Sequence, residues 1–195
     1  MERRFFTSPN EKSEESRAVF LDRDGTINKE KNYLYRFDDW EWINGAIESI
    51  RILNRNNFLV IIVSNQSGIS RGFYEVEDVD FLHNQVLKDL EKHNAYIDAI
   101  YFCPHHPEFD FKPCNCRKPG NDMILDAAKK FNIDLSKSWI IGDKISDCIS
   151  GIKSGASCIL VKTGYGKSEV HKLNQEFDVK ESIKEAVSLI ISNPK

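Results

Sequence analysis

Apolar and polar positions along the chain form two kinds of block. Short runs that are apolar throughout predict buried strands, because a strand covered on both faces has no polar alternation. These runs cover residues 18–21, 58–63, 97–102, 139–141 and 158–161. Longer blocks place apolar residues three and four positions apart, which is the spacing of one helix face. These blocks cover residues 44–53, 75–93, 122–131, 145–154 and 182–191.

The predicted strands and helices alternate along almost the whole chain. Such alternation predicts an α/β fold, with a Rossmann-like, doubly wound, mostly parallel sheet and helices on both faces. A chain of 195 residues is long enough to bury a core without crosslinks. We expect a single domain over residues 17–195, preceded by a polar, solvated tail over residues 1–16.

Polar residues stand directly after four of the predicted strands. They are Asp22, Ser64, Cys103 and Asp143. The carboxyl ends of parallel strands meet at one edge of a doubly wound sheet, and ligands bind at that edge. We therefore expect these four side chains to gather at one rim of the sheet.

The first of these positions begins an unusual pair of carboxylates. Asp22 and Asp24 lie two residues apart on an extended segment, so their side chains project to the same side. Gly25 allows a sharp turn, and Thr26 offers a hydroxyl there. This pair suits a divalent cation, a nucleophile and an acid/base group. The alternative is that both aspartates only cap a turn.

A second group of candidate ligands lies further along the chain. Three thiols and an imidazole, from Cys103, His105, Cys114 and Cys116, form a set that Zn²⁺ prefers. Because all four positions of a tetrahedral site would be filled, we expect a structural role, with the metal ordering a loop of low apolar content. His106 is a competing nitrogen ligand. The other alternative is that the thiols are merely close in sequence.

Composition narrows the class of protein and the cellular compartment in which it works. The hydrophobic share of 41% and the charged share of 29% are those of an ordinary globular protein, and the net charge of −3 gives no reason to expect a nucleic-acid or membrane partner. No apolar run approaches the length needed to cross a bilayer, and the N-terminal residues lack the apolar stretch of a signal peptide, so we expect neither a membrane span nor a signal peptide. Five cysteines, three of them within fourteen residues, favour metal ligation in a reducing cytoplasm over a disulfide framework. Cys148 and Cys158 are expected to be ordinary packing residues.

Four segments, taken in order, resemble the motifs of the haloacid dehalogenase (HAD) superfamily of phosphatases. They are Asp22-x-Asp24-Gly25-Thr26, Ser64, Lys118 and Gly142-Asp143-Lys144-x-x-Asp147. The resemblance covers about residues 17 to 165 and implies Mg²⁺-dependent phosphoryl transfer.

The resemblance also implies a role for each residue. Asp22 would attack phosphorus and carry an aspartyl-phosphate, and Asp24 would protonate the leaving oxygen and then activate water. Mg²⁺ would be held by the Asp22 carboxylate, the Asp24 backbone carbonyl and Asp143. Ser64 and Lys118 would bind the phosphoryl oxygens.

The zinc-type loop between the second and third motifs is similar to that of the histidinol-phosphatase-like subfamily. Within it, the chain most resembles the D-glycero-D-manno-heptose 1,7-bisphosphate 7-phosphatase family. The supporting segments are Asn65-Gln66-Ser67-Gly68-Ile69-x-Arg71-Gly72, Cys103-Pro-His-His-Pro and Cys116-Arg-Lys-Pro. The family has no large cap domain. The resemblance implies a sugar-phosphate substrate on the route to ADP-heptose and lipopolysaccharide core, and a cytoplasmic monomer.

By the same resemblance, a short flap that contains Glu30–Tyr33 and several loops would line the substrate pocket. Its expected residues are Glu30, Lys31, Asn32, Tyr33, Ser64, Asn65, Gln66, Ser67, Arg117, Lys118 and Lys144. The fork of Arg117 suits a second phosphate, but Arg117 could instead form a surface ion pair or hold the zinc-type loop. Lys144 is either a substrate contact or an exposed residue at a helix start. Asp147 either approaches the metal through water or stabilises the first helical turn.

The chain departs from the family pattern in three places. It reads Gly120-Asn121-Asp122-Met123 where Pro-Gly-Met is usual, Ser64 replaces a common threonine, and the loop between His105 and Cys114 is short. These changes bear on substrate identity more than on reaction type. Histidinol phosphate is therefore the competing substrate. A zinc-organised module for single-stranded nucleic acid is the competing class, although the ligands are not flanked by a basic and aromatic run.

Overall fold

A seven-stranded sheet forms the centre of the computed structural model, which describes residues 1–5, 15–110, 114–172 and 177–193. The strand order is β1-β4-β3-β2-β5-β6-β7. The strands are β1 (Glu2–Phe5), β2 (Ala18–Leu21), β3 (Leu59–Asn65), β4 (Ala99–Cys103), β5 (Trp139–Gly142), β6 (Ser157–Val161) and β7 (Asp178–Lys180). The pair β1–β4 is antiparallel, and all the other pairs are parallel.

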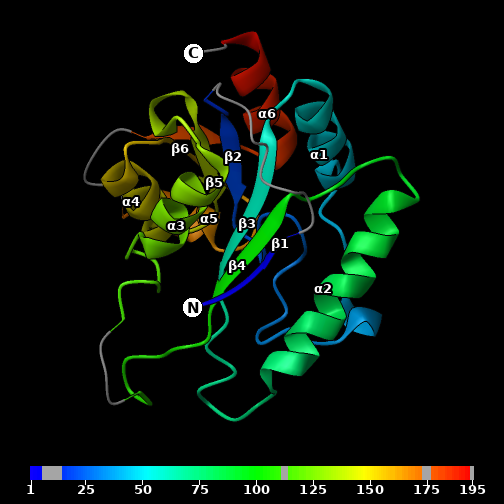
Figure 1. Ribbon diagram of the computed structural model, residues 1–195, viewed down its shortest axis with the longest axis vertical. Coiled ribbons are helices and arrows are strands. Elements are labelled where there is room, and N and C mark those ends of the chain that lie inside the picture. Colours follow the sequence, from blue (N-terminus) through cyan, green and yellow to red (C-terminus); the bar gives the residue numbers. More distant parts are fainter. Residues whose placement is uncertain (6–14, 111–113, 173–176, 194–195) are drawn as a thin grey trace.

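Helices cover both faces of this sheet. They are α1 (Ala46–Arg55), α2 (Val76–Glu91), α3 (Asp122–Phe131), α4 (Ile145–Ser154), α5 (Gly166–Val170) and α6 (Ile183–Ser192), with short 3₁₀ turns at Phe37–Asp39 and Leu135–Lys137. Figure 1 shows α1, α2 and α6 on one side of the sheet and α3 and α4 on the other.

The central strands contribute side chains to a separate core on each face. In β2, Val19 and Leu21 pack with residues of α1, α2 and α6, whereas Ala18 and Phe20 pack with residues of α3. Alternate residues of a strand point to opposite faces, so a strand between two helical layers must be apolar throughout. This explains the unbroken apolar runs in the sequence.

The predicted fold class is confirmed, and each predicted strand and helix is present with its ends within two residues of the prediction. The structure adds β1, β7 and α5. The expectation of a solvated tail is wrong for Glu2–Phe5, because this segment pairs with the edge of β4. The backbone groups of an edge strand can bond a segment that has no apolar run of its own. Residues 6–14 lie outside the described residues.

A second correction concerns Cys148 and Cys158, which form a disulfide and are not ordinary packing residues. Cys148 lies in α4 and Cys158 in β6, and α4 packs directly against β6. Their Cα atoms are 5.1 Å apart, within the range that a disulfide spans. No sequence pattern indicates this pairing, because it depends on the packing of α4 against β6.

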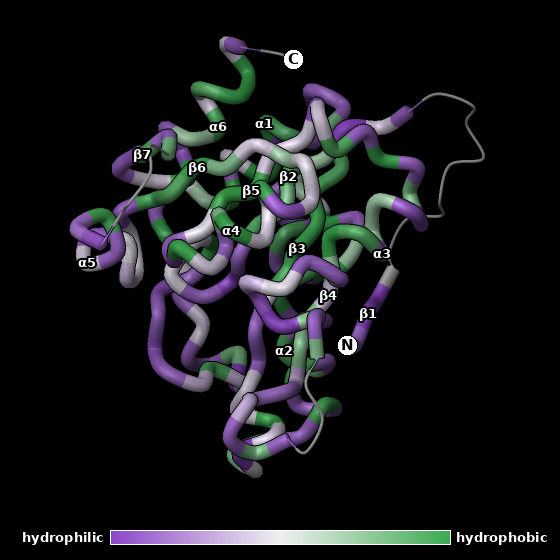
Figure 2. The backbone as a smooth tube through the Cα atoms, turned by 90° about the vertical axis from the view of Figure 1, so that its left-hand side faces the viewer, coloured by the Kyte–Doolittle hydropathy of each residue, from purple (hydrophilic) through white to green (hydrophobic). Residues whose placement is uncertain are grey.

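The loops at the carboxyl ends of β2, β3 and β4 extend together beyond one end of the sheet (Figure 1). In Figure 2 these loops are largely hydrophilic, whereas the central strands are largely hydrophobic. Between β2 and α1 the described chain contains one 3₁₀ turn, isolated bridges, turns and bends, and between β3 and α2 turns and bends, so neither segment forms a cap domain. No helix in the described ranges has the length and apolarity required to cross a membrane.

Candidate active site

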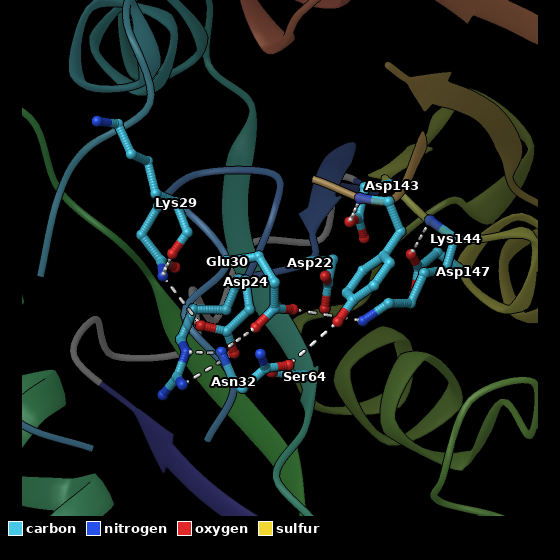
Figure 3. A network of polar contacts seen from close by, with 12 residues as sticks. Asp22, Asp24, Lys29, Glu30, Asn32, Ser64, Asp143, Lys144 and Asp147 are labelled. Carbon is cyan, nitrogen blue, oxygen red and sulfur yellow. Dashed lines mark hydrogen bonds and ion pairs between the residues drawn. The ribbon is translucent and has the colours of Figure 1, made fainter. Parts of the chain in front are cut away.

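The sheet order brings the motif residues together. Asp22 follows β2, and its N–H donates to the Ile141 carbonyl of β5 at 2.9 Å. Ser64 lies near the end of β3 and Asp143 directly follows β5, and both strands are neighbours of β2. Figure 3 shows Asp22, Asp143 and Asp147 close together, with Ser64 on the neighbouring strand.

Three carboxylates lie close together at this rim, and two of them share one ammonium. Ligand atoms of Asp22, Asp143 and Asp147 all lie within 4.8 Å of one another. The Lys118 Nζ lies 2.6 Å from Asp22 Oδ1 and 2.7 Å from Asp147 Oδ1, and it also donates to the Val63 carbonyl at 2.7 Å. These acceptors use all three N–H groups of the lysine. The three carboxylates therefore outnumber the cation among them.

This excess of negative charge appears in the pKa values of the buried carboxyl groups. Burial raises the pKa of the Asp143 carboxyl to about 8, and repulsion from Asp22 and Asp147 adds to the rise. Burial also raises the pKa of Asp22 to about 6, although Lys118 opposes the rise. Within the described residues, Asp143 Oδ1 is buried without a hydrogen-bond partner. A negative, all-oxygen set with a free ligand atom fits a hard divalent cation such as Mg²⁺.

Two glycines allow the chain to pass directly against Asp143. A Cβ atom at Gly25 or at Gly164 would lie 2.1 Å from Asp143 Oδ2. Gly25 also has a φ of +87°, a conformation that favours glycine. The glycine of the first motif is therefore required by close approach as well as by the turn.

Asp24 is held in a separate set of contacts. Its Oδ2 lies 2.8 Å from the fully buried Arg23 guanidinium and 3.0 Å from Gln66 Nε2, and its Oδ1 accepts from Asn28 at 2.9 Å. Burial alone would raise the pKa of Asp24, but Arg23 and these hydrogen bonds outweigh it and hold that pKa below its usual range. Asp24 is thus ionised at neutral pH. Nothing in the sequence marked Arg23 as its partner.

The loop residues fix Lys118 from a second direction. Asn65 Oδ1 accepts from the Lys118 backbone N–H at 3.0 Å, and Asn65 Nδ2 donates to the Lys118 carbonyl at 3.1 Å. Asp147 Oδ2 also accepts from the Lys144 backbone N–H at 3.0 Å at the start of α4. Asp147 therefore both stabilises the first helical turn and pairs with Lys118.

A cavity of about 450 Å³ opens above these groups. Its lining contains the expected residues Asp22, Asp24, Glu30, Asn32, Tyr33, Ser64, Asn65, Gln66, Ser67, Arg117, Lys118, Lys144 and Asp147, together with Tyr74, Ser146 and Tyr165. The expected contact Lys31 is absent from this lining, because its ammonium pairs with Glu41 at 2.5 Å. We therefore correct its placement in the pocket.

Tyr165 is the added residue with the clearest structural role. Its hydroxyl donates to Asn32 Oδ1 of the flap at 3.2 Å, and Lys144 Nζ lies 4.5 Å from its ring centre. Lys144 also approaches Glu30 of the flap at 3.7 Å. The flap is thus linked across the cavity to α4 and α5. Tyr165 lies outside every motif, so no sequence signal indicated it.

The zinc-type loop is rich in thiols, and this thiol-rich loop brings the predicted zinc ligands together. Cys103 Sγ lies 3.6 Å from Cys114 Sγ, 3.1 Å from Cys116 Sγ and 3.6 Å from His105 Nδ1. In a tetrahedral zinc site, ligand atoms are separated by about 3.5–3.8 Å, so the group is close to a metal-bound geometry. His106 is turned away, with its Nε2 2.9 Å from an Arg71 nitrogen. The geometry therefore favours His105 over His106.

Arg117 links this loop to the cavity. It donates to the His105 carbonyl at 3.2 Å and also lines the cavity. Cys116 directly precedes Arg117 and Lys118 in the chain. Order in the thiol-rich loop therefore controls where both cations lie.

The sheet order and the site together define a HAD-type hydrolase. The carboxylate pair Asp22 and Asp24 follows the central strand, and a serine, a lysine and a second acidic pair lie beside it. Residues 115–186 match the family model described as HAD-hydrolase-like. A D-glycero-alpha-D-manno-heptose-1,7-bisphosphate 7-phosphatase of Photorhabdus laumondii is 40% identical over 158 residues, covering 78% of this chain and 86% of that protein. The corresponding beta enzyme of Pasteurella multocida is 38% identical over 180 residues, covering 89% and 96%.

A solved structure agrees with these sequence matches. The D,D-heptose 1,7-bisphosphate phosphatase from B. bronchiseptica, complexed with magnesium and phosphate, has a TM-score of 0.84 and 27% identity, and the match covers 90% of this chain and 98% of that chain. The chain belongs to the family of D-glycero-D-manno-heptose-1,7-bisphosphate 7-phosphatases and is a phosphatase of the HAD superfamily.

Proposed function

We propose that this protein hydrolyses the 7-phosphate of D-glycero-D-manno-heptose 1,7-bisphosphate and leaves the heptose 1-phosphate. The observation that carries the proposal is the buried group of Asp22, Asp147 and Lys118 in the wall of a polar cavity, with Asp143 packed within 4.8 Å of both carboxylates. The named relatives favour this substrate over histidinol phosphate. The zinc-organised nucleic-acid module has no comparable support.

In this proposal the two aspartates of the first motif have separate roles. Asp22 attacks phosphorus through a carboxylate oxygen, and the bond from phosphorus to the sugar oxygen breaks. Asp24, which is ionised in the substrate-free site, takes up a proton from solvent as the substrate binds, gives it to that oxygen, and then takes a proton from the water that hydrolyses the aspartyl-phosphate. The second step returns Asp22 to a free carboxylate and releases inorganic phosphate. Asp24 thus regains the proton that it gave away.

The remaining charged groups bind the phosphates. Mg²⁺, held by Asp22, Asp143 and the Asp24 backbone carbonyl, would neutralise charge on the phosphoryl oxygens. Ser64 and Lys118 would contact the oxygens of the transferred group. We assign Arg117 to the second phosphate, because its guanidinium lines the cavity and can bind two oxygens at once. Lys144 and the flap residues Glu30, Asn32 and Tyr33 would contact the sugar.

The thiol-rich loop is proposed to bind one structural Zn²⁺ through Cys103, His105, Cys114 and Cys116. The support is the mutual approach of the four ligand atoms to within 4.8 Å. Three of the five cysteines are free thiols that a metal site needs reduced, which favours a cytoplasmic location, although Cys148 and Cys158 form a disulfide. We also propose that the monomer is the active form, which size-exclusion chromatography of the active enzyme tests.

The proposal is tested by measuring phosphate release with Mg²⁺ from a panel of substrates. The panel contains both C1 anomers of the heptose bisphosphate, because relatives named for either anomer are almost equally similar, at 40% and 38% identity. It also contains histidinol phosphate. We expect kcat/KM for the better anomer to exceed that for histidinol phosphate at least about 100-fold, since a site built for a second phosphate is left unpaired by a monophosphate.

The matched control is Asp22→Asn, which keeps the size of the side chain and removes its nucleophilic oxygen. It should reduce turnover by about 10⁴-fold or more while the circular dichroism spectrum stays unchanged. Retained turnover in this variant contradicts the role of Asp22. A preference for histidinol phosphate contradicts the substrate.

A further inference from the structure

Gln66 occupies a central position between the two halves of the site, although it follows β3 as part of a predicted substrate loop. It is 2% exposed. Its Oε1 accepts hydrogen bonds from Arg23 at 3.1 Å and from the Tyr74 hydroxyl at 3.0 Å. Its Nε2 donates to Asp24 Oδ2 at 3.0 Å and to Ser64 Oγ at 2.7 Å. The amide therefore uses two donor and two acceptor positions inside the protein, which leaves it little capacity to bind substrate.

Arg23 determines which way this amide faces. A guanidinium only donates hydrogen bonds, so the group beside it must be the amide oxygen. Arg23 is itself fully buried and fixed, because it donates to the Leu34 carbonyl at 2.8 Å and pairs with Asp24 at 2.8 Å. The N–H groups of Gln66 are consequently directed to the opposite side, toward Asp24 and Ser64.

This orientation has a chemical consequence for Ser64. The hydroxyl oxygen accepts the hydrogen bond from Gln66, so the hydroxyl hydrogen is available to donate elsewhere. Ser64 lines the cavity, where a phosphoryl oxygen is an acceptor. The amide thus prepares Ser64 as a donor to the transferred group before the substrate arrives.

The same amide fixes one oxygen of Asp24. Asp24 Oδ2 is shared by Gln66 and Arg23, and Oδ1 is held by Asn28. A carboxylate held at both oxygens has one orientation, and an acid/base group acts only within hydrogen-bond reach of its proton donor or acceptor. Figure 3 shows Asp24 and Ser64, the two side chains that Gln66 connects.

We propose that Gln66 is a positioning residue that orients Asp24 and Ser64 together, and that it is not a substrate contact. The inference rests on the proposed function in one respect, namely that Asp24 and Ser64 act in phosphoryl transfer. It predicts that loss of the amide lowers kcat with little change in KM. The loss should be larger for a sugar phosphate than for 4-nitrophenyl phosphate, because a nitrophenolate needs little protonation on leaving.

The test compares Gln66→Met with the wild-type protein on both substrates. Methionine keeps the length and approximate volume and removes both donors. We expect kcat on the heptose bisphosphate to fall about 100-fold with KM within about threefold, and kcat on 4-nitrophenyl phosphate to fall less than about tenfold. Tyr74→Phe removes one bond to the amide oxygen and should lower kcat on the heptose bisphosphate about fivefold, so it gives a second measurement if the first variant does not fold.

Asn54→Leu is the matched control, since it removes another buried amide with two hydrogen bonds. Asn54 bonds both backbone groups of Tyr96, at 3.1 and 3.0 Å, at the opposite end of the strands. It should lower the free energy of unfolding and leave kcat unchanged. A kcat unchanged in Gln66→Met, a loss carried by KM, or equal losses on both substrates would overturn the proposal. If the wild type prefers another sugar phosphate, the same ratio is measured on that substrate, so the two proposals fail separately.

Discussion

At the scale of single residues, the site is defined by too few positive charges for its carboxylates. Lys118 is fully committed to Asp22, Asp147 and a backbone carbonyl, and Asp143 retains an oxygen without a partner in the described residues. Desolvated like charges raise each other's pKa values. A bound divalent cation would remove this repulsion, so the metal requirement follows from the protein's own charges.

The charge imbalance predicts how stability depends on pH. The folded-state pKa values of Asp22 and Asp143 are raised to about 6 and about 8, so between pH 5 and 8 the folded protein binds more protons than the unfolded chain. The free energy of unfolding in EDTA should therefore fall as pH rises across this window, by about 3 kcal/mol, because the two carboxylates contribute a fall of roughly 5 kcal/mol and buried His83, whose pKa is lowered to about 3, opposes it by roughly 2 kcal/mol. Asp24, whose pKa is lowered, is ionised throughout this range and contributes no slope. Urea denaturation at several pH values measures the trend.

Mg²⁺ should reverse this trend, because it competes with protons for the same oxygens. Its stabilising effect should be larger at pH 8 than at pH 5. The Asp143→Asn variant removes one of the titrating groups and should flatten the slope in EDTA. A stability in EDTA that rises between pH 5 and 8 would show that these carboxylates are not desolvated together.

Sequence reasoning found most of the residues that line the cavity but not the contacts that orient them. Asp22 and Ser64 stand at strand ends, and that position alone predicts that they meet at one rim. The roles of Arg23 and Gln66 depend on which side chains face each other across β2 and β3. A linear pattern contains no such information. Lys31 was misplaced for the same reason, since its partner Glu41 lies ten residues away on the other arm of the flap.

At the scale of elements, the thiol-rich loop is the segment whose order depends most on a ligand. Its described residues include few buried apolar ones, and it joins the rest of the site through Cys116, Arg117 and Lys118 and through the Cys103 carbonyl, which accepts from the Gln66 backbone N–H at 2.8 Å. Removal of the metal would release the backbone that positions both cations. The zinc proposal therefore has a functional as well as a structural consequence.

His105 and His106 form a matched pair for testing this consequence. His105→Ala should reduce bound zinc from about one equivalent to well below one and lower kcat/KM by about tenfold or more, because the ligand set is broken. His106→Ala should retain the zinc, since this side chain contacts Arg71 and accepts from the Glu108 backbone N–H, and does not contact the thiols. Metal analysis of the purified variants, combined with the phosphatase assay, measures both effects. Equal zinc content in the two variants would contradict the proposed ligand set.

The strands and helices that have their own apolar pattern were predicted from the sequence. The strands that form only by pairing with a neighbouring strand were not. The strands β2 to β6 are apolar because helices cover both of their faces. The edge strands β1 and β7 read Glu-Arg-Arg-Phe and Asp-Val-Lys. Their strand conformation comes from backbone pairing with β4 and β6, and this pairing places little demand on their side chains.

At the scale of the whole molecule, one sheet joins two hydrophobic cores. The core toward α1, α2 and α6 and the core toward α3 are formed by alternate residues of the same strands. Neither core can lose its strands without disrupting the other. The interpretation of residues 17–195 as a single domain therefore predicts one cooperative unit of folding.

This prediction is tested by urea unfolding in the presence of Mg²⁺ and Zn²⁺ with two probes. Trp40 and Trp139 are buried in the first core, so tryptophan fluorescence reports the loss of that core. Far-ultraviolet circular dichroism reports the helices of both faces. The two midpoints should coincide and the slopes should agree, because both signals follow the same loss of buried surface. A dichroism transition that precedes the fluorescence transition would mean that the α3 side unfolds first, and the single-domain interpretation would then fail although the sheet order is correct.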